Sequence, residues 1–256
     1  MPTDELSVGG VPADAVSVLE TAEIVLEGRM PWASNSTFLV RLEPHDVDGR
    51  DTRCASSSDI DLPYGIYKPV RGERPLWDFE PGLHRRELAA YLLSEKMGIG
   101  AVPPTVVRVN APLGEGSVQW FVHADHREHY FTIAEQRPDL HDQLRAIAVL
   151  DVVANNTDRK SGHCLLAGDR VWAIDNGLCF AAEYKLRTVI WEFAGDPLTD
   201  EQITAVTSVA EHVPASIAAL LAPAEIDGVR GRAAWLAEHG VLPGDDSGHR
   251  YPWPLV

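Results

Sequence analysis

The chain has 256 residues, 45% of them hydrophobic, and a formal net charge of −16 from 22 Lys+Arg and 38 Asp+Glu. The hydrophobic content is enough for a buried core and excludes disorder as the main state. The negative charge disfavours nucleic acid and anionic membrane surfaces as partners, because both are themselves negatively charged.

The cysteines and the hydropathy pattern bear on the compartment. Cys54, Cys164 and Cys179 are an odd number without CxxC spacing, which argues against a disulfide framework or a cysteine zinc site. No apolar run reaches the roughly 18 residues that a membrane span requires. Residues 1–10 lack the basic start and apolar stretch of a signal peptide. We therefore expect a cytoplasmic protein.

The first half of the chain is typical of strands with one helix. Residues 1–16 are predicted to be a polar arm, and residues 43–61, rich in Asp and Ser, a surface insertion. Residues 83–97 have an apolar stripe at helical spacing, followed by Gly98 as a C-cap. Alternation of apolar residues predicts strands at 23–27, 37–42, 64–70, 102–109 and 117–122.

The second half is predicted to be mainly helical. Residues 123–138 form a poorly patterned connection, and a helix is expected from Asp139 onward. A hairpin is predicted around Gly168-Asp169, and the remainder is expected to be helical with breaks at prolines. The fold class is therefore α+β, with a strand-rich N-lobe at 1–122, a mainly helical C-lobe at 123–256 and a cleft between them.

Two acids flank the predicted hairpin. Asp158 lies in the loop before it, and Asp175 ends its second strand 17 residues later, followed by Asn176-Gly177. Because a hairpin returns the chain to its start, we expect both carboxylates to lie close together, an arrangement that suits divalent-metal chemistry on a phosphate. The alternative for Asp158 is an ordinary turn or cap aspartate.

A lysine and a polar loop precede the acids. Lys68 lies on a predicted interior strand, where its ammonium needs a partner, and Glu87 on the next helix is a candidate. The small polar residues Ser34, Asn35 and Ser36 let backbone N–H groups and hydroxyls reach phosphate oxygens. The alternatives are a lysine that reaches solvent, a glutamate paired with a surface neighbour, and an ordinary polar turn.

Six segments, in order between about residues 28 and 195, carry a family resemblance. They are GRMPWASNSTFLV, YKP, RRELAAYLLSEKMGIGAVPPTVV, GSVQWFV, NNTDR and AIDNGLCF. With them the chain resembles the atypical kinases related to phosphatidylinositol 3- and 4-kinases. Its motifs are most like those of the type II phosphatidylinositol 4-kinases, and it is similar, more distantly, to HipA-type kinases. It also looks like an actinobacterial group described as phosphatidylinositol-kinase-like. The resemblance implies a two-lobed, protein-kinase-like fold.

The resemblance also implies roles in nucleotide binding. Lys68 would grip the α- and β-phosphates and Glu87 would orient it. The segment Ser34, Asn35 and Ser36 would cover the phosphates, and Phe121-Val122 would lie at the adenine-binding hinge.

In the catalytic and metal loops, the resemblance makes Asp158 the catalytic carboxylate, with Asn156 as a further catalytic candidate in NNTDR. Asp175 would hold the metal that bridges the phosphates. Five residues after Asp158, where these kinases usually have an asparagine metal ligand, the chain has His163. Imidazole suits Mn²⁺ better than Mg²⁺, so we expect a manganese preference. A structural, hydrogen-bonding histidine is the alternative.

The predicted function is a phosphotransferase that uses ATP or GTP with Mn²⁺ or Mg²⁺. The acceptor would be a protein hydroxyl, including the chain's own Ser56–Ser58, or a small cytosolic molecule, since the charge disfavours a lipid surface. Two alternatives are a pseudokinase that binds nucleotide without turnover, and transfer of AMP in place of phosphate. His123, His126 and His129 are spaced three apart, whereas metal-binding helices more often use i, i+4 spacing with an acidic base. We predict a solvated loop there, with a zinc site as the alternative.

Overall fold

A computed structural model describes residues 10–31, 35–43, 62–76, 79 and 81–255. The chain divides into two compact units, Met1–His84 with Pro104–Phe121, and Arg85–Pro103 with Val122–Val256. The segment 85–103, which the sequence assigns to the N-lobe, belongs to the second unit. Within the described residues, no helix has both the length and the apolarity needed to cross a bilayer.

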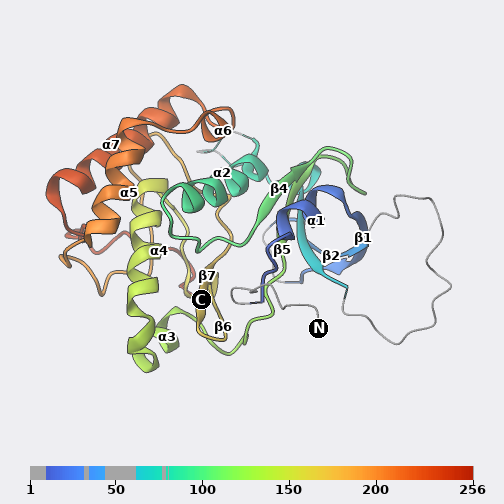
Figure 1. The fold of residues 1–256 in the computed structure, drawn as a ribbon, viewed down its shortest axis with the longest axis horizontal. Helices are drawn as coiled ribbons and strands as arrows, with labels where there is room; N and C mark the ends of the chain where they lie inside the picture. The colour runs from blue at the N-terminus through green and yellow to red at the C-terminus, as the bar shows by residue number, and fades with distance from the viewer. Residues whose placement is uncertain (1–9, 32–34, 44–61, 77–78, 80, 256) are drawn as a thin grey trace. The chain divides into compact units, whose positions relative to one another are not determined.

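The first unit is built on one antiparallel sheet of five strands (Figure 1). Its spatial order is β1 (Glu23–Arg29), β2 (Phe38–Glu43), β3 (Tyr64–Pro69), β5 (Gly116–Trp120) and β4 (Thr105–Arg108). Leu19, Val40, Tyr67 and Val118 are fully buried in its core, and a 3-10 turn, η2 (Val70–Gly72), follows β3. The strands follow the predicted alternation closely.

The N-terminal arm expected at residues 1–16 is a helix in part. Residues Ala15–Thr21 form α1, which packs on β4. Its last carbonyls are satisfied by Arg108 of β4, whose Nη1 donates to Leu19 O (2.7 Å) and Ala22 O (3.1 Å). The expectation was wrong because the residue that caps this helix is remote in sequence.

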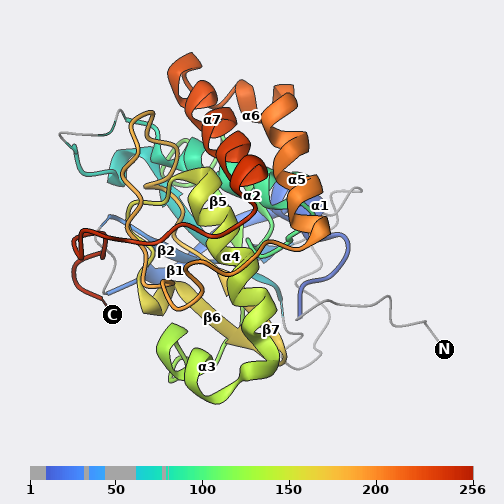
Figure 2. The ribbon, with the colours of Figure 1, turned by 90° about the vertical axis from the view of Figure 1, so that its left-hand side faces the viewer.

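The second unit is helical apart from one hairpin. Helix α4 (His141–Ala154) is buried along most of its length and contacts strand β7 and helices α5 and α7 (Figure 2). The remaining elements are α2 (Leu83–Lys96, which starts in the first unit), α3 (Tyr130–Gln136), η3 (Pro138–Leu140), η4 (Ser161–His163), β6 (Cys164–Ala167), β7 (Arg170–Ala173), α5 (Asp200–Glu211), α6 (Ala215–Ala218) and α7 (Pro223–His239).

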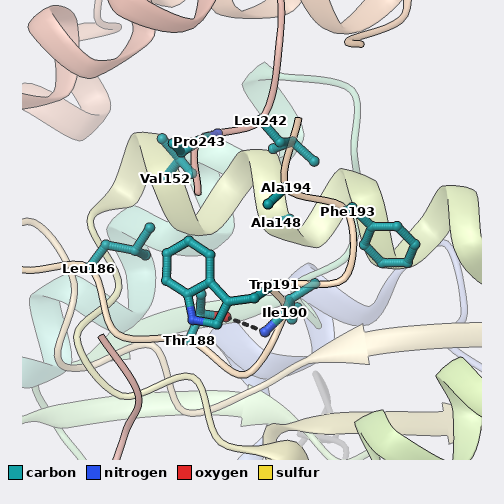
Figure 3. A pocket seen from close by; sticks show the side chains of 10 residues that line it. All are labelled: Ala148, Val152, Leu186, Thr188, Ile190, Trp191, Phe193, Ala194, Leu242 and Pro243. Atoms are coloured by element: carbon teal, nitrogen blue, oxygen red, sulfur yellow. Dashed lines mark hydrogen bonds between the residues drawn. The ribbon is translucent and has the colours of Figure 1, made fainter. Parts of the chain in front are cut away.

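Two segments of the second unit differ from the expectation. Helix α3 lies in the connection predicted to lack pattern, and its fully buried Tyr130 donates a hydrogen bond to Glu192. Residues 176–199, expected to be helical, contain neither helix nor strand. In Figure 3, Leu186, Ile190 and Phe193 of this segment line a pocket together with residues of α4, and Ile190 N donates to Thr188 Oγ1 (3.0 Å).

Candidate active site

The loop that carries Asp158 starts where α4 ends. Asn155 takes the left-handed conformation (φ 51°) and ends the helix. Asn156, fully buried, donates from Nδ2 to Asp151 Oδ1 (3.0 Å) and accepts from Asp158 N at its Oδ1 (2.9 Å). The Asn156 side chain therefore holds the backbone of Asp158, while its predicted catalytic role stays a prediction.

The Asp158 carboxylate has a basic neighbour. Its Oδ2 lies 3.0 Å from Lys160 Nζ, and the Asp158 side chain is 22% exposed. Burial raises the pKa of Asp158 above its usual value, the Lys160 ammonium opposes this rise, and the charge of Asp175 adds to it. A carboxylate with a raised pKa and an open face can accept a proton from a hydroxyl. Lys160 was not among the predicted site residues, although it lies only two residues after the acid in the sequence.

Asp175 follows strand β7 in a strained conformation. Its φ is 58°, unusual for a residue with a side chain, and that side chain is 50% exposed. The Asp175 Oδ2 atom lies 3.4 Å from Nε2 of His163. The hairpin therefore returns Asp175 to the loop of Asp158, as the spacing predicted.

His163 contacts both loops. Its Nδ1 lies 2.9 Å from the carbonyl oxygen of Asp158 and 3.4 Å from the backbone N of Lys160, so the loop of Asp158 holds this side of the ring. In the neutral tautomer with hydrogen on Nδ1, the ring would present the lone pair of Nε2 to the Asp175 carboxylate. Two acceptors that face each other at this distance suit a shared cation, and nitrogen with carboxylate oxygen is a donor set that fits Mn²⁺.

A buried polar network, which was not predicted from the sequence, holds the loops of Asp158 and Asp175. The Arg159 side chain is fully buried, and its Nη2 donates to Asp151 Oδ1 (2.9 Å) and to Asn176 Oδ1 (2.7 Å). Glu87 of α2, also buried, accepts from Asn176 N at its Oε2 (3.0 Å). In the sequence, the signal of this network is Asp151, an acid among the apolar residues of α4. A buried acid of this kind requires a buried partner, which here is Arg159.

The predicted nucleotide residues of the first unit lie on β3 and the neighbouring loops. Lys68 lies on β3 opposite Ser117 of β5. Asn35 Oδ1 accepts from Arg74 N (3.0 Å), and Ser36 N donates to Gly72 O (3.1 Å). Ser34 lies outside the described residues. Lys68 belongs to the first unit and Glu87 to the second, so their predicted pairing stays a prediction.

The two hinge candidates fall on either side of the unit boundary. Phe121 N donates to Tyr64 O (3.0 Å) in the first unit, and Val122 is buried and belongs to the second. Their proposed contact with adenine likewise stays a prediction.

In the part of the chain that the structure describes, no cluster of three or more His, Cys, Asp or Glu side chains is placed to hold a metal. A cation at Asp175 and His163 would take its other ligands from a bound molecule, as Mg²⁺ and Mn²⁺ do when they bind nucleotide phosphates. Cys164 and Cys179 are buried, and burial raises the pKa of Cys164 to about 12, which disfavours the reactive thiolate form there.

Comparison of the sequence identifies the family. No family model matches the chain. Protein Rv2133c of Mycobacterium tuberculosis (strain ATCC 25618 / H37Rv) is 36% identical over 279 aligned positions, which cover 94% of this chain and 95% of that protein. The chain belongs to the Rv2133c family.

Comparison with solved structures identifies the fold of this Rv2133c family member. The Golgi casein kinase with Mn/ADP bound matches with a TM-score of 0.53 at 13% identity, over 98% of this chain and 81% of that one. The hydra Fam20 structure with sugar matches with a TM-score of 0.55 at 11% identity, over 92% and 91%. The mixed α/β fold with its antiparallel sheet is therefore similar to that of the Fam20 kinases. The finer likeness to phosphatidylinositol kinases stays a prediction.

Proposed function

We propose that this member of the Rv2133c family is an atypical kinase, a phosphotransferase that depends on a nucleotide and a divalent metal. The observation that carries the proposal is that the second unit brings Asp158, Lys160, His163 and Asp175 to one end of the hairpin. The fold supports it, because a kinase with Mn and ADP bound has a similar fold.

The residues of the second unit have separate roles in this proposal. Asp175 and His163 hold the cation, which when bound neutralises phosphate charge. Asp158 orients the acceptor hydroxyl and takes its proton, aided by its raised pKa. The Lys160 ammonium, 3.0 Å from Asp158, supplies positive charge for the transferred phosphoryl group. Catalysis is thus mainly positioning and charge neutralisation.

The remaining predicted site residues bind the nucleotide in the same proposal. Lys68 binds the α- and β-phosphates, and Ser34, Asn35 and Ser36 cover them. Glu87 orients Lys68, and adenine or guanine lies against Phe121 and Val122. Since the motifs that support these roles resemble those of phosphatidylinositol-kinase relatives, we propose that branch as the finer relationship.

The acceptor we propose is a protein hydroxyl or a small cytosolic molecule. The net charge of −16 disfavours an anionic lipid surface. Autophosphorylation would fall on Ser56–Ser58, which lie outside the described residues. Incubation with ATP and Mn²⁺ should add increments of about 80 Da per phosphate to the intact mass. An unchanged mass would exclude self-modification and leave transfer to another acceptor.

The decisive assay measures ATP consumption and thermal stabilisation side by side. A kinase consumes ATP slowly with metal and is stabilised by nucleotide. Stabilisation without consumption would show the pseudokinase alternative, and a mass increment of about 329 Da would show AMP transfer. If neither ATP nor GTP with Mn²⁺ or Mg²⁺ stabilises the protein, the proposed function is wrong.

The metal preference has its own test. We expect Mn²⁺ to support nucleotide binding better than Mg²⁺, because an imidazole nitrogen is a better ligand for Mn²⁺. His163→Asn should shift this preference toward Mg²⁺. Equal affinity with both metals in the parent protein would contradict a ligand role for His163.

A further inference from the structure

The residues that directly follow the two candidate acids contact each other. Arg159 comes after Asp158 and Asn176 comes after Asp175, and Arg159 Nη2 donates to Asn176 Oδ1 at 2.7 Å. Both side chains are excluded from solvent, with 0% of Arg159 and 1% of Asn176 exposed. One buried, charge-assisted hydrogen bond thus joins the two loops, a single peptide unit away from each acid.

On its own side, Arg159 has little freedom to move. Its Nε donates to Asp151 Oδ2 (3.0 Å), its Nη2 to Asp151 Oδ1 (2.9 Å) and its Nη1 to the carbonyl oxygen of Ile174 (2.6 Å). A two-point contact between guanidinium and carboxylate fixes the plane of the guanidinium group as well as its position. The Arg159 donor that faces Asn176 is therefore held by helix α4.

Asn176 is held on three sides. Besides accepting from Arg159, it donates from Nδ2 to Ala173 O (3.2 Å) and from its backbone N to Glu87 Oε2 (3.0 Å). The preceding residue, Asp175, has a φ of 58°, a conformation that persists only where its surroundings fix it. The hydrogen bonds of Asn176, the next residue, restrain the backbone of Asp175 in this conformation.

We propose that Arg159 and Asn176 form a positioning pair, which sets the separation and direction of the Asp158 and Asp175 carboxylates and thereby the metal affinity of the site. The inference rests on the proposed function. Neither residue touches the reacting atoms; both act through the acids that precede them. Second-sphere contacts of this kind are worth 10–100-fold in metal affinity in other sites, about the range expected here.

The test measures the dissociation constant of ADP with Mn²⁺, and of ADP alone, by titration calorimetry, together with thermal unfolding. Asn176→Ala removes the acceptor for Arg159 and should weaken Mn²⁺-dependent ADP binding on the order of 10-fold or more. Asn176→Asp keeps an oxygen toward Arg159 but loses the Nδ2 donor to Ala173 O, and it should restore part of this affinity. Binding of ADP without metal should change little in either variant.

A matched control separates positioning from stability. Ser94 is fully buried in the same unit, and its Oγ accepts from Ala101 N (2.9 Å). Ser94→Ala removes a buried hydrogen bond that involves neither the two acids nor Arg159 and Asn176, and it should lower thermal stability without changing Mn²⁺-dependent binding. If Asn176→Ala does not fold, Arg159→Lys, which keeps the charge beside Asp151 and removes the fork, serves in its place with the same expected loss.

The outcomes distinguish this inference from the proposed function. If the parent protein binds ADP no better with Mn²⁺ than without it, the proposed function and the inference both fail. If the parent shows metal-dependent binding and the Asn176 or Arg159 variant retains the affinity of Ser94→Ala, the inference alone is overturned.

Discussion

The two units hold their candidate site residues in different ways. In the second unit, a buried network of hydrogen bonds fixes the loops of Asp158 and Asp175. Almost all of its members lie within residues 151–176, and Arg159 is at its centre. In the first unit, Lys68 lies on a strand, and Asn35 and Ser36 are held by contacts to the chain at 72–74. The candidate catalytic residues are thus fixed by contacts local in sequence, whereas the proposed nucleotide-binding residues come from segments far apart in sequence.

The first unit has a cluster of hydrogen-bonded titratable side chains of its own, at the start of α2. The buried His84 ring lies between Glu73 (3.3 Å from Nδ1) and Glu115 (3.1 Å from Nε2). Glu73 also accepts from the backbone N–H groups of Gly82 (2.9 Å) and His84 (3.1 Å). The two clusters differ in consequence: changes in the second unit should affect catalysis and stability together, and changes in the first should affect stability in a pH-dependent way.

The largest effect is expected at Asp158. Asp158→Asn removes the proton acceptor while the loop keeps its backbone contacts, so turnover should fall by about 10²–10⁴-fold. Steady-state ATP consumption measures it, with the dissociation constant of ADP and Mn²⁺ as the control, since nucleotide binding should remain. A variant that turns over nucleotide like the parent would show that Asp158 is a turn residue only.

The next effect concerns the network beneath the acids. Arg159→Met leaves Asp151 buried without its cation, which should cost about 3–5 kcal/mol of unfolding free energy. Denaturant titration measures the loss. Adding Asp151→Leu should recover part of it, because an apolar pair avoids the uncompensated charge. Equal stability of the single and double variants would argue against this account.

A smaller, pH-dependent effect is expected at Glu73. Burial alone would raise the pKa of Glu73, but hydrogen bonds from His84 and from the backbone of Gly82 and His84 lower it to about 2. A lowered pKa stabilises the fold above the unfolded value of about 4.3, and this stability is lost as the pH falls toward 2. Glu73→Gln should therefore cost about 1–3 kcal/mol at pH 7 and progressively less below pH ~4. A loss that does not vary with pH would show that the carboxylate charge is irrelevant.

The smallest expected effect is a gain in stability. Because the pKa of Asp158 is raised, the folded state favours the neutral form of this carboxyl group. Ionisation of Asp158 therefore lowers the free energy of unfolding as the pH rises above the pKa that Asp has in the unfolded chain. Asp158→Asn should thus raise the melting temperature at pH 7, by roughly 2–4 °C if the gain is about 1 kcal/mol. Calorimetry at pH 3 is the control, because the difference should disappear where the carboxyl is protonated in both states.

The sequence predicted those elements whose signals are local. Strands β1 to β3, helix α2 and the hairpin lie within a few residues of the expected ranges, because alternation, helical spacing and Gly168 mark them. Helices α1 and α3 were missed because Arg108 and Glu192, distant in sequence, complete them. Residues 176–199 were expected to be helical, since their apolar content does not show that they pack as irregular chain against α4.

In the candidate site, too, local signals were predictable and contacts between buried side chains were not. The proximity of Asp158 and Asp175 was predictable, because a hairpin of known length brings its two ends together, and His163 was indicated by the family resemblance. Arg159 and Asn176 were not, since a sequence does not show which polar side chains are buried and paired with each other. The relation of Lys68 to Glu87 depends on how two units meet, which no local pattern encodes.

The most direct test of the account is a crystal structure of the protein with ATP or its non-hydrolysable analogue and Mn²⁺. We expect the metal between the Asp175 carboxylate, the His163 imidazole and the nucleotide phosphates, with the terminal phosphate facing Asp158 and the inner phosphates at Lys68. A nucleotide bound with its α-phosphate toward Asp158 would contradict phosphate transfer. A metal or nucleotide bound away from both aspartates would contradict the shared site itself.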